Sequence, residues 1–389
     1  FWQQIERIFQ REAAYVIPPA PPTFTPGFRY DRVTTDDAVD TYELNLLSRL
    51  LPVADHRLTL GLDLGHDSAE LSNRTSTSVL FGPPLPPTVS QRDRADAEQL
   101  RLGIYLQDEW TMGDWKLTSG ARFDHFAVED NLAGTDQEET GLSGAVSLQY
   151  EADPTTTHFV SLASGFRVPD LGERYQDAIV NIGQPSRVIG NPDLEPERSW
   201  NIEVGSKHEG ESFRYTAALF YNYVQDFIND ERQLGVVGGF STEQFQNAGD
   251  VTLYGFELEA GYRIDENWQL FGNAARTYTD DEDLVSLRDW VFNYGLHYEA
   301  DPGYAWLETF RSSLTLRTVL DSENTVDDVD FDGFTVADFQ IELQLPEHRH
   351  GQTRILLGLR NLTNESYEEP FFEAEQPERS GFVSVEHRF

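Results

Sequence analysis

Apolar residues recur at every second position through much of the chain. In one extended segment the apolar side chains share one face and the remaining residues share the other: Leu100, Leu102, Ile104 and Leu106 against Arg101, Gly103, Tyr105 and Gln107. The same alternation returns in residues 115–123, 142–150, 215–223, 339–345 and 355–359. A period of two residues is typical of β-strands with two different faces. The pattern predicts about sixteen strands.

The connections between these strands alternate between short and long. Short turns are predicted at residues 51–55, 112–114, 152–155, 209–211, 265–267, 300–303 and 346–351. Long connections are predicted at residues 17–40, 71–97, 130–139, 166–198, 227–244, 280–284, 320–332 and 363–379. Many strands exceed the roughly 10 residues that a tilted strand needs to cross a bilayer. This rhythm predicts an all-β transmembrane antiparallel barrel that uses residues 1–389 as one unit, with its long loops outside the cell.

Composition supports membrane crossing by strands and narrows the chemistry. No stretch approaches the roughly 20 apolar residues of a spanning helix, and mean hydropathy is -0.49 although 12% of the residues are aromatic. The chain has no Cys, which excludes disulfides, thiolate metal sites and Cys nucleophiles. With no serine nucleophile elbow and no zinc-protease motif, we expect no enzyme, no catalytic residues and no cofactor.

The chain is strongly acidic. Its 67 Asp and Glu residues against 29 Lys and Arg residues give a net charge of -38. Such a charge repels nucleic-acid phosphate and excludes nucleic acid as a partner. Two interpretations remain open: an acidic surface distributed for solubility, or an acidic vestibule that attracts cations.

The two ends of the chain differ in character. Val383, Val385 and Phe389 share one face of the last segment, and a terminal aromatic on such a strand is similar to the assembly signal of outer-membrane barrels. We therefore expect the last strand to descend to the periplasm. The segment that begins at Phe1 opens directly on strand-like sequence without a signal peptide, so we expect the native chain to begin earlier.

Six stretches, in this order, resemble TonB-dependent outer-membrane receptors. They are YLQDEW (105–110), ARFDHF (121–126), SGFRVPDLGERY (164–175), GNPDLEPERSWNIEVG (190–205), NAGDVTLYGFELEAGY (247–262) and LRNLTNESY (359–367). The resemblance implies a 22-stranded barrel with an N-terminal plug, of which this chain would be the C-terminal part without the plug and first strands. It implies import of an iron chelate, a TonB complex that acts through the missing plug, and contact with outer-membrane lipid and lipopolysaccharide.

The resemblance leaves the cargo open. The FRVP and NPDL stretches are similar to a paired box of haem receptors, in which a histidine between the boxes would bind haem iron. Residues 167–190 contain no His, and Tyr175 is the one residue there able to bind ferric iron through a phenolate. Ferric siderophores and haem both remain candidate cargoes.

Candidate site residues lie in the predicted extracellular loops. Arg167, Arg174, Tyr175 and Arg187 form the most cation-rich loop and could hold anionic groups of a chelate. Alternatively, Arg167 and Arg174 pair with Asp170, Glu173 and Glu195 to brace that loop. His66 and His125 are expected near the outer ends of ascending strands, where they would face cargo or line the membrane boundary.

A second candidate site is a calcium loop. Asp328, Asp330, Asp332 and Gly333 match the opening of such a loop, but Phe339 stands where a bidentate Glu would close it. A plain acidic loop is the alternative. Two other functions also stay open for the whole chain, a passive porin and a loop-presenting adhesin or receptor subunit.

Overall fold

The computed structural model describes residues 2–17, 27–50, 55–81, 88–131, 134–182, 184–237, 240–280, 290–324, 329–347, 351–368 and 376–388. Within these ranges no helix has the length and apolar character needed to cross a membrane. Nearly all of the described chain is β-strand.

Sixteen strands form one antiparallel meander. They are β1 (Trp2–Ile17), β2 (Gly27–Arg49), β3 (His56–Phe81), β4 (Thr88–Met112), β5 (Trp115–Asp130), β6 (Thr135–Asp153), β7 (Thr156–Arg167), β10 (Glu197–Glu209), β11 (Phe213–Val237), β12 (Phe240–Arg263), β13 (Trp268–Thr279), β14 (Val291–Ala300), β15 (Thr309–Val319), β18 (Phe334–Gln344), β19 (Gln352–Arg360) and β20 (Ser380–Arg388). Each pairs with the next in this order. The fold class and strand number predicted from alternation are confirmed.

The remaining elements lie in the long connections. Between β7 and β10 the chain forms α1 (Leu171–Tyr175), β8 (Asp177–Ile182) and β9 (Gln184–Ile189). Strand β9 extends the sheet by pairing in parallel with β12 through residues 186–189 and 241–244. Between β15 and β18 a small separate hairpin contains β16 (Ser322–Asn324) and β17 (Val329–Phe331).

Several predicted long loops are instead extended hairpins. Strand β1 pairs with β2 out to Ile17 and Gly27, β3 pairs with β4 out to Thr77 and Thr88, and β11 pairs with β12 out to Val237 and Phe240. The predicted loops at residues 17–40, 71–97 and 227–244 were therefore too long. Antiparallel pairing continues past the apolar band because the backbone ladder needs no alternation of apolar side chains.

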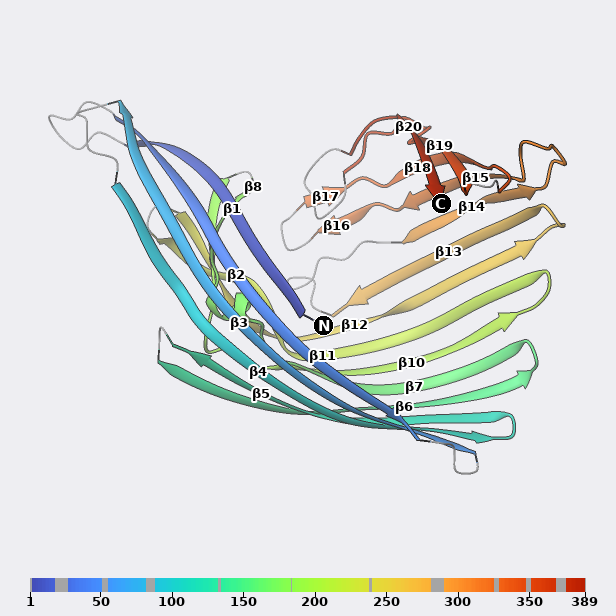
Figure 1. Cartoon of the computed structure of the whole chain (residues 1–389), viewed down its shortest axis with the longest axis horizontal. Coiled ribbons are helices and arrows are strands. Elements are labelled where there is room, and N and C mark those ends of the chain that lie inside the picture. The colour runs from blue at the N-terminus through green and yellow to red at the C-terminus, as the bar shows by residue number, and fades with distance from the viewer. Residues whose placement is uncertain are drawn as a thin grey trace.

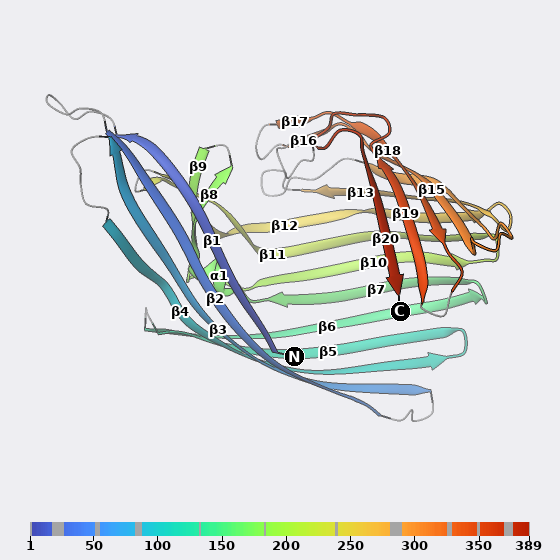
Figure 2. The ribbon, with the colours of Figure 1, turned by 45° about the horizontal axis from the view of Figure 1, so that its top comes forward.

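The sheet curves strongly without closing. Figures 1 and 2 show β1–β4 rising at one side and β13–β20 at the other, with the tight turns of β4–β7 gathered at the end opposite the long hairpins. No pairing joins β1 to β20 among the described residues. The connections still alternate as predicted, so the long ones lie together at one edge of the sheet.

The two faces of the sheet have opposite character. On β4 the side chains of Leu100, Ile104 and Leu106 are 51%, 50% and 49% exposed, whereas that of Gln99, next to Leu100, is 8% exposed. A soluble sheet would bury the leucines and expose the glutamine. The exposed face is apolar over strand after strand, which is the surface that a lipid bilayer covers.

Candidate functional site

The connection between β7 and β10 folds onto the polar face of the sheet. Tyr175 of α1 packs with Ala69, Ala97 and Val128, and Leu171 packs against the same cluster. These wall residues belong to β3, β4 and β5, on the face of Gln99 rather than that of Leu100. We call residues 168–196 the mouth segment, because they lie against the inner wall at the edge with the long connections.

The local sequence explains why α1 forms there. Asp170 caps the helix by accepting a hydrogen bond from the Glu173 backbone N at 2.8 Å, and the Glu173 carboxylate accepts one in return from the Asp170 backbone N. This reciprocal capping box satisfies two backbone donors at the first turn. The PDLGERY stretch therefore forms one short helical turn that points Tyr175 at the wall.

Arg167 fastens the mouth segment to the barrel. Its Nε donates to Glu197 at 2.6 Å, and its Nη1 donates to both carboxylate oxygens of Glu173 at 2.8 and 2.9 Å. The other Glu197 oxygen accepts the backbone N of Ile228 at 2.8 Å. The carboxylates of Glu197 and Glu173 raise the pKa of Arg167 above its ordinary value. One guanidinium thus joins β7, α1 and β10, and Glu197 extends the connection to β11.

Arg174 and Tyr175 are buried beneath the segment. Arg174 is 1% exposed, and its Nη1 donates to the Pro192 carbonyl at 3.0 Å and to the Gln137 side chain. Its Nε and Nη2 make no hydrogen bond, and burial lowers its pKa below the ordinary value. Burial also raises the pKa of Tyr175, with Asp130 adding to the effect. Both side chains face the protein interior.

Arg187 completes the predicted cation-rich loop. It forms a bidentate pair with Asp177 across the β8–β9 hairpin, with both N–O distances at 2.6 Å, and this pairing raises its pKa. Arg167 pairs with Glu173, as the bracing alternative expected. Its second partner is Glu197 instead of Glu195, and among the described residues Arg174 forms no ion pair with Asp170, Glu173 or Glu195. Ligand binding by these residues stays a prediction.

His66 and His125 lie on the outer face of the sheet. His66 pairs in register with Leu100, and His125 pairs with Leu102. His66 Nε2 lies 3.4 Å from the Glu98 carboxylate. Because partners in register share a face, both histidines lie on the lipid-facing side, opposite the mouth segment. This geometry favours the membrane-boundary alternative over contact with cargo.

The candidate calcium loop is described only in part. Asp328 falls outside the described residues, whereas Asp330 lies in β17 and Asp332 follows it. The Gly333 backbone N donates to Asp321 at 2.6 Å. In the described portion of the chain no three His, Asp or Glu side chains converge as a metal site would require. Calcium binding stays a prediction, and the proposed assembly signal at Phe389 also lies outside the described residues.

Sequence analysis missed a network of ion pairs on the inner wall. Arg122 bridges Asp63 and Asp124 at 2.5 and 2.7 Å, Arg101 pairs with Asp67 at 3.1 Å, and Lys116 pairs with Glu109 at 2.9 Å. These residues come from β3, β4 and β5, and the partners are 2 to 59 positions apart. Alternation alone puts Arg122 and Asp124 on one face of β5, but only the strand register brings together the partners that lie on different strands.

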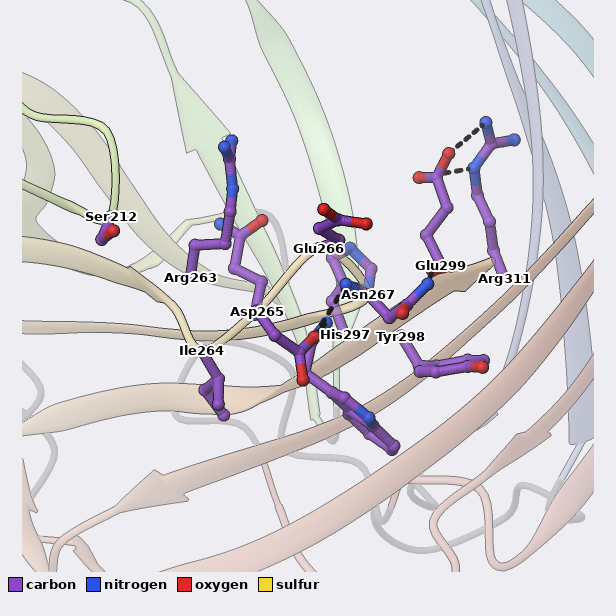
Figure 3. A pocket seen from close by; sticks show the side chains of 12 residues that line it. Ser212, Arg263, Ile264, Asp265, Glu266, Asn267, His297, Tyr298, Glu299 and Arg311 are labelled. Atoms are coloured by element: carbon purple, nitrogen blue, oxygen red, sulfur yellow. Dashed lines mark hydrogen bonds and ion pairs between the residues drawn. The ribbon is translucent and has the colours of Figure 1, made fainter. Parts of the chain in front are cut away.

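A hollow of about 570 Å³ opens at the tight-turn edge, around the β12–β13 turn. Figure 3 shows Arg263, Glu266 and His297 around it, with the Arg311–Glu299 ion pair at one side. The Arg311 Nε lies 3.1 Å from the Glu299 carboxylate, and its Nη1 lies 2.8 Å from Glu342. The hollow is lined by charged, polar and aromatic residues and lies at the opposite end of the strands from the mouth segment.

Comparisons with known proteins agree with this architecture. A family model described as TonB dependent receptor-like, beta-barrel, matches residues 18–362. The chain is 26% identical over 269 residues to the iron-regulated outer membrane virulence protein of Vibrio cholerae serotype O1, covering 64% of this chain and 37% of that protein. It is 24% identical over 261 residues to the ferrioxamine B receptor of Salmonella typhimurium, covering 63% of this chain and 32% of that receptor.

A solved structure shares the fold over nearly the whole chain. The copper transporter OprC superposes with a TM-score of 0.71 at 18% identity, covering 98% of this chain and 65% of that one. The chain spans about a third of the length of the two curated relatives above. Because the family model matches most of the sequence, the chain belongs to the TonB-dependent receptor β-barrel family and is an outer-membrane protein of a Gram-negative bacterium.

Proposed function

We propose that this chain is the barrel portion of a TonB-dependent receptor that binds an iron chelate, a ferric siderophore or haem, and imports it. One observation carries the proposal: a sheet with an apolar outer face and an ion-paired inner wall has a segment docked on that wall at its long-loop edge. Family membership and the iron-related names of its relatives support it. Such a wall suits passage of a polar solute.

In this proposal the chain performs no bond chemistry and needs no cofactor, because the iron chelate is cargo. The long hairpins and the mouth segment contact cargo outside the cell, and the polar wall lines its path inward. Energy for release would come from a TonB complex acting on a plug that precedes this chain. The apolar face would contact outer-membrane lipid, with lipopolysaccharide around its outer edge.

Uptake in cells tests the proposal. The receptor is expressed from its whole gene in a Gram-negative host that lacks its own siderophore and haem receptors. Radioactive iron is supplied as ferrioxamine B or as haem. We expect saturable uptake that disappears when TonB is deleted. Uptake that is unsaturable and independent of TonB, together with steady conductance through the purified protein in planar bilayers, would instead establish a passive porin.

A further inference from the structure

The charges around the mouth segment narrow the class of cargo. We propose that the receptor takes a ferric chelate whose net charge is zero or positive in preference to an anionic chelate. This inference rests on the proposed function and adds the charge of the substrate to it. Three sets of groups carry it: the long connections, the arginines of the mouth segment, and the cations of the inner wall.

Two stretches near the long-loop edge carry negative charge without compensation. Residues 129–139 contain five Asp and Glu residues and no Lys or Arg, and residues 321–332 contain six and none. The first stretch is the end of the β5–β6 hairpin, and the described part of the second stretch forms the β16–β17 hairpin and its flanks, both at the edge of the sheet where cargo would arrive. A concentration of like charge at a vestibule raises the local concentration of cations and lowers that of anions.

The connection that contains the mouth segment is itself negative, and its arginines are engaged. Residues 167–197 hold three Arg and six Asp or Glu residues, a net charge of -3. Arg167 binds two carboxylates, Arg187 binds one, and Arg174 is 1% exposed. The exposed side chains of Asp193 and Glu195 add negative charge beside them. An anionic chelate would have to displace a carboxylate from an arginine, whereas a cationic one meets free carboxylates.

Arginines on the inner wall, deeper in the path of the cargo, are also paired with carboxylates. Arg101, Arg122 and Arg311 are each held by at least one carboxylate within 3.1 Å. Arg122 contacts two carboxylates, so its cluster is net negative. Arg311 also contacts two, but its cluster continues through Glu342 to Arg354, Glu386 and Arg388 and is neutral. Charge-assisted pairs of this kind are among the stronger polar contacts, so the wall cations offer little binding to an incoming anion.

A charge series on one chelate tests the inference. Ferrioxamine B carries one positive charge through its free amine, its N-acetyl derivative is neutral, and its N-succinyl derivative is anionic, while the iron centre is the same in all three. Binding to cells that express the receptor from its whole gene is measured with each probe at low and high salt, with haem as an additional anionic probe. We expect the cationic form to bind about 10-fold more tightly than the anionic form at about 10 mM salt. The difference should shrink to about 2-fold at 0.5 M salt, where the Debye length falls to a few ångströms.

Two double variants test which carboxylates cause the preference for the cationic probe. Asp193→Asn with Glu195→Gln removes two exposed charges from the mouth segment, and we expect it to reduce the preference for the cationic probe at least 2-fold. Glu211→Gln with Glu266→Gln removes two exposed charges at tight turns and should leave the preference unchanged. Equal binding of all three forms at low salt, or tighter binding of the anionic form or of haem, overturns the inference while the receptor function stands. If none of the four probes binds or enters, the proposed function itself fails, and the inference falls with it.

Discussion

The Nε of Arg167 donates to Glu197 at 2.6 Å across the β7–β10 pair, where the two residues stand directly opposite in register. Because the same guanidinium also binds Glu173, this contact joins the barrel wall to the first turn of α1. The arginine of the FRVP stretch is thus a structural link between the wall and the mouth segment.

Replacing this arginine should loosen the mouth segment. Arg167→Gln loses its charge-assisted bonds to both carboxylates, and because the side chain is 44% exposed we expect solvent to limit the loss to about 1 kcal/mol. A loss of that size corresponds to roughly 5-fold faster proteolysis within residues 168–196. Arg198→Gln is the matched control, because Arg198 lies over the Phe166 ring and contacts neither Glu173 nor Glu197 in the described structure. If the two variants were equally protected from proteolysis, the ion pairs of Arg167 would not be what holds the mouth segment on the wall.

The docking of α1 should weaken at high pH through Tyr175. Burial raises the pKa of this phenol in the docked state above its ordinary value near 10, so the neutral phenol is the form that packs on Ala97 and Val128. The stabilisation is complete below pH of about 10 and is lost as pH rises through the raised pKa, because the undocked phenol ionises first.

Limited proteolysis between pH 8 and 11 measures this effect. The wild-type segment should become more accessible above pH of about 10, with Asp130 opposing ionisation and Arg174 favouring it. Tyr175→Phe keeps the ring without the titrating group and should stay protected over the same range. An identical pH profile for the two proteins would assign the change to other groups.

The alternation of apolar and polar residues predicted the two faces of the barrel wall. It did not predict the contacts between the mouth segment and that wall. The two faces of β4 could be assigned from residues 99–106 alone, because one period of two residues fixes every side chain of a strand. The contact of Tyr175 with Ala69 joins residues more than 100 positions apart, and no local pattern encodes it. Counting strands placed His66 and His125 near the outer edge without assigning their face, and the register with Leu100 and Leu102 shows that both lie on the outer face.

Replacing Gly61 on the inner wall with alanine should destabilise the protein. Gly61 stands opposite Tyr105, and a Cβ there would lie 1.9 Å from a ring carbon. We expect Gly61→Ala to cost about 1–3 kcal/mol of unfolding free energy by overpacking. In a Tyr105→Ala background the same change should cost less than about 0.5 kcal/mol, so that a double-mutant cycle isolates the contact.

Denaturant unfolding in lipid vesicles provides the measurement. Gly120→Ala is the control, because the nearest atom to its added Cβ is a backbone oxygen at 3.5 Å, an ordinary contact. If Gly61→Ala were as well tolerated as Gly120→Ala, the ring of Tyr105 would not lie over Gly61 as described.

The orientation of the whole sheet can be tested at the middle of β11. Leu219 is 56% exposed and belongs to the apolar outer face, whereas Asn222 belongs to the opposite, polar face. An arginine on a lipid-facing strand position costs about 2–4 kcal/mol near the bilayer midplane. We therefore expect Leu219→Arg to lower the unfolding free energy in lipid vesicles by that amount. Asn222→Arg, whose side chain stays on the hydrated wall, should cost less than about 1 kcal/mol. Equal costs at the two positions, or a larger cost at Asn222, would mean that lipid does not cover the leucine face.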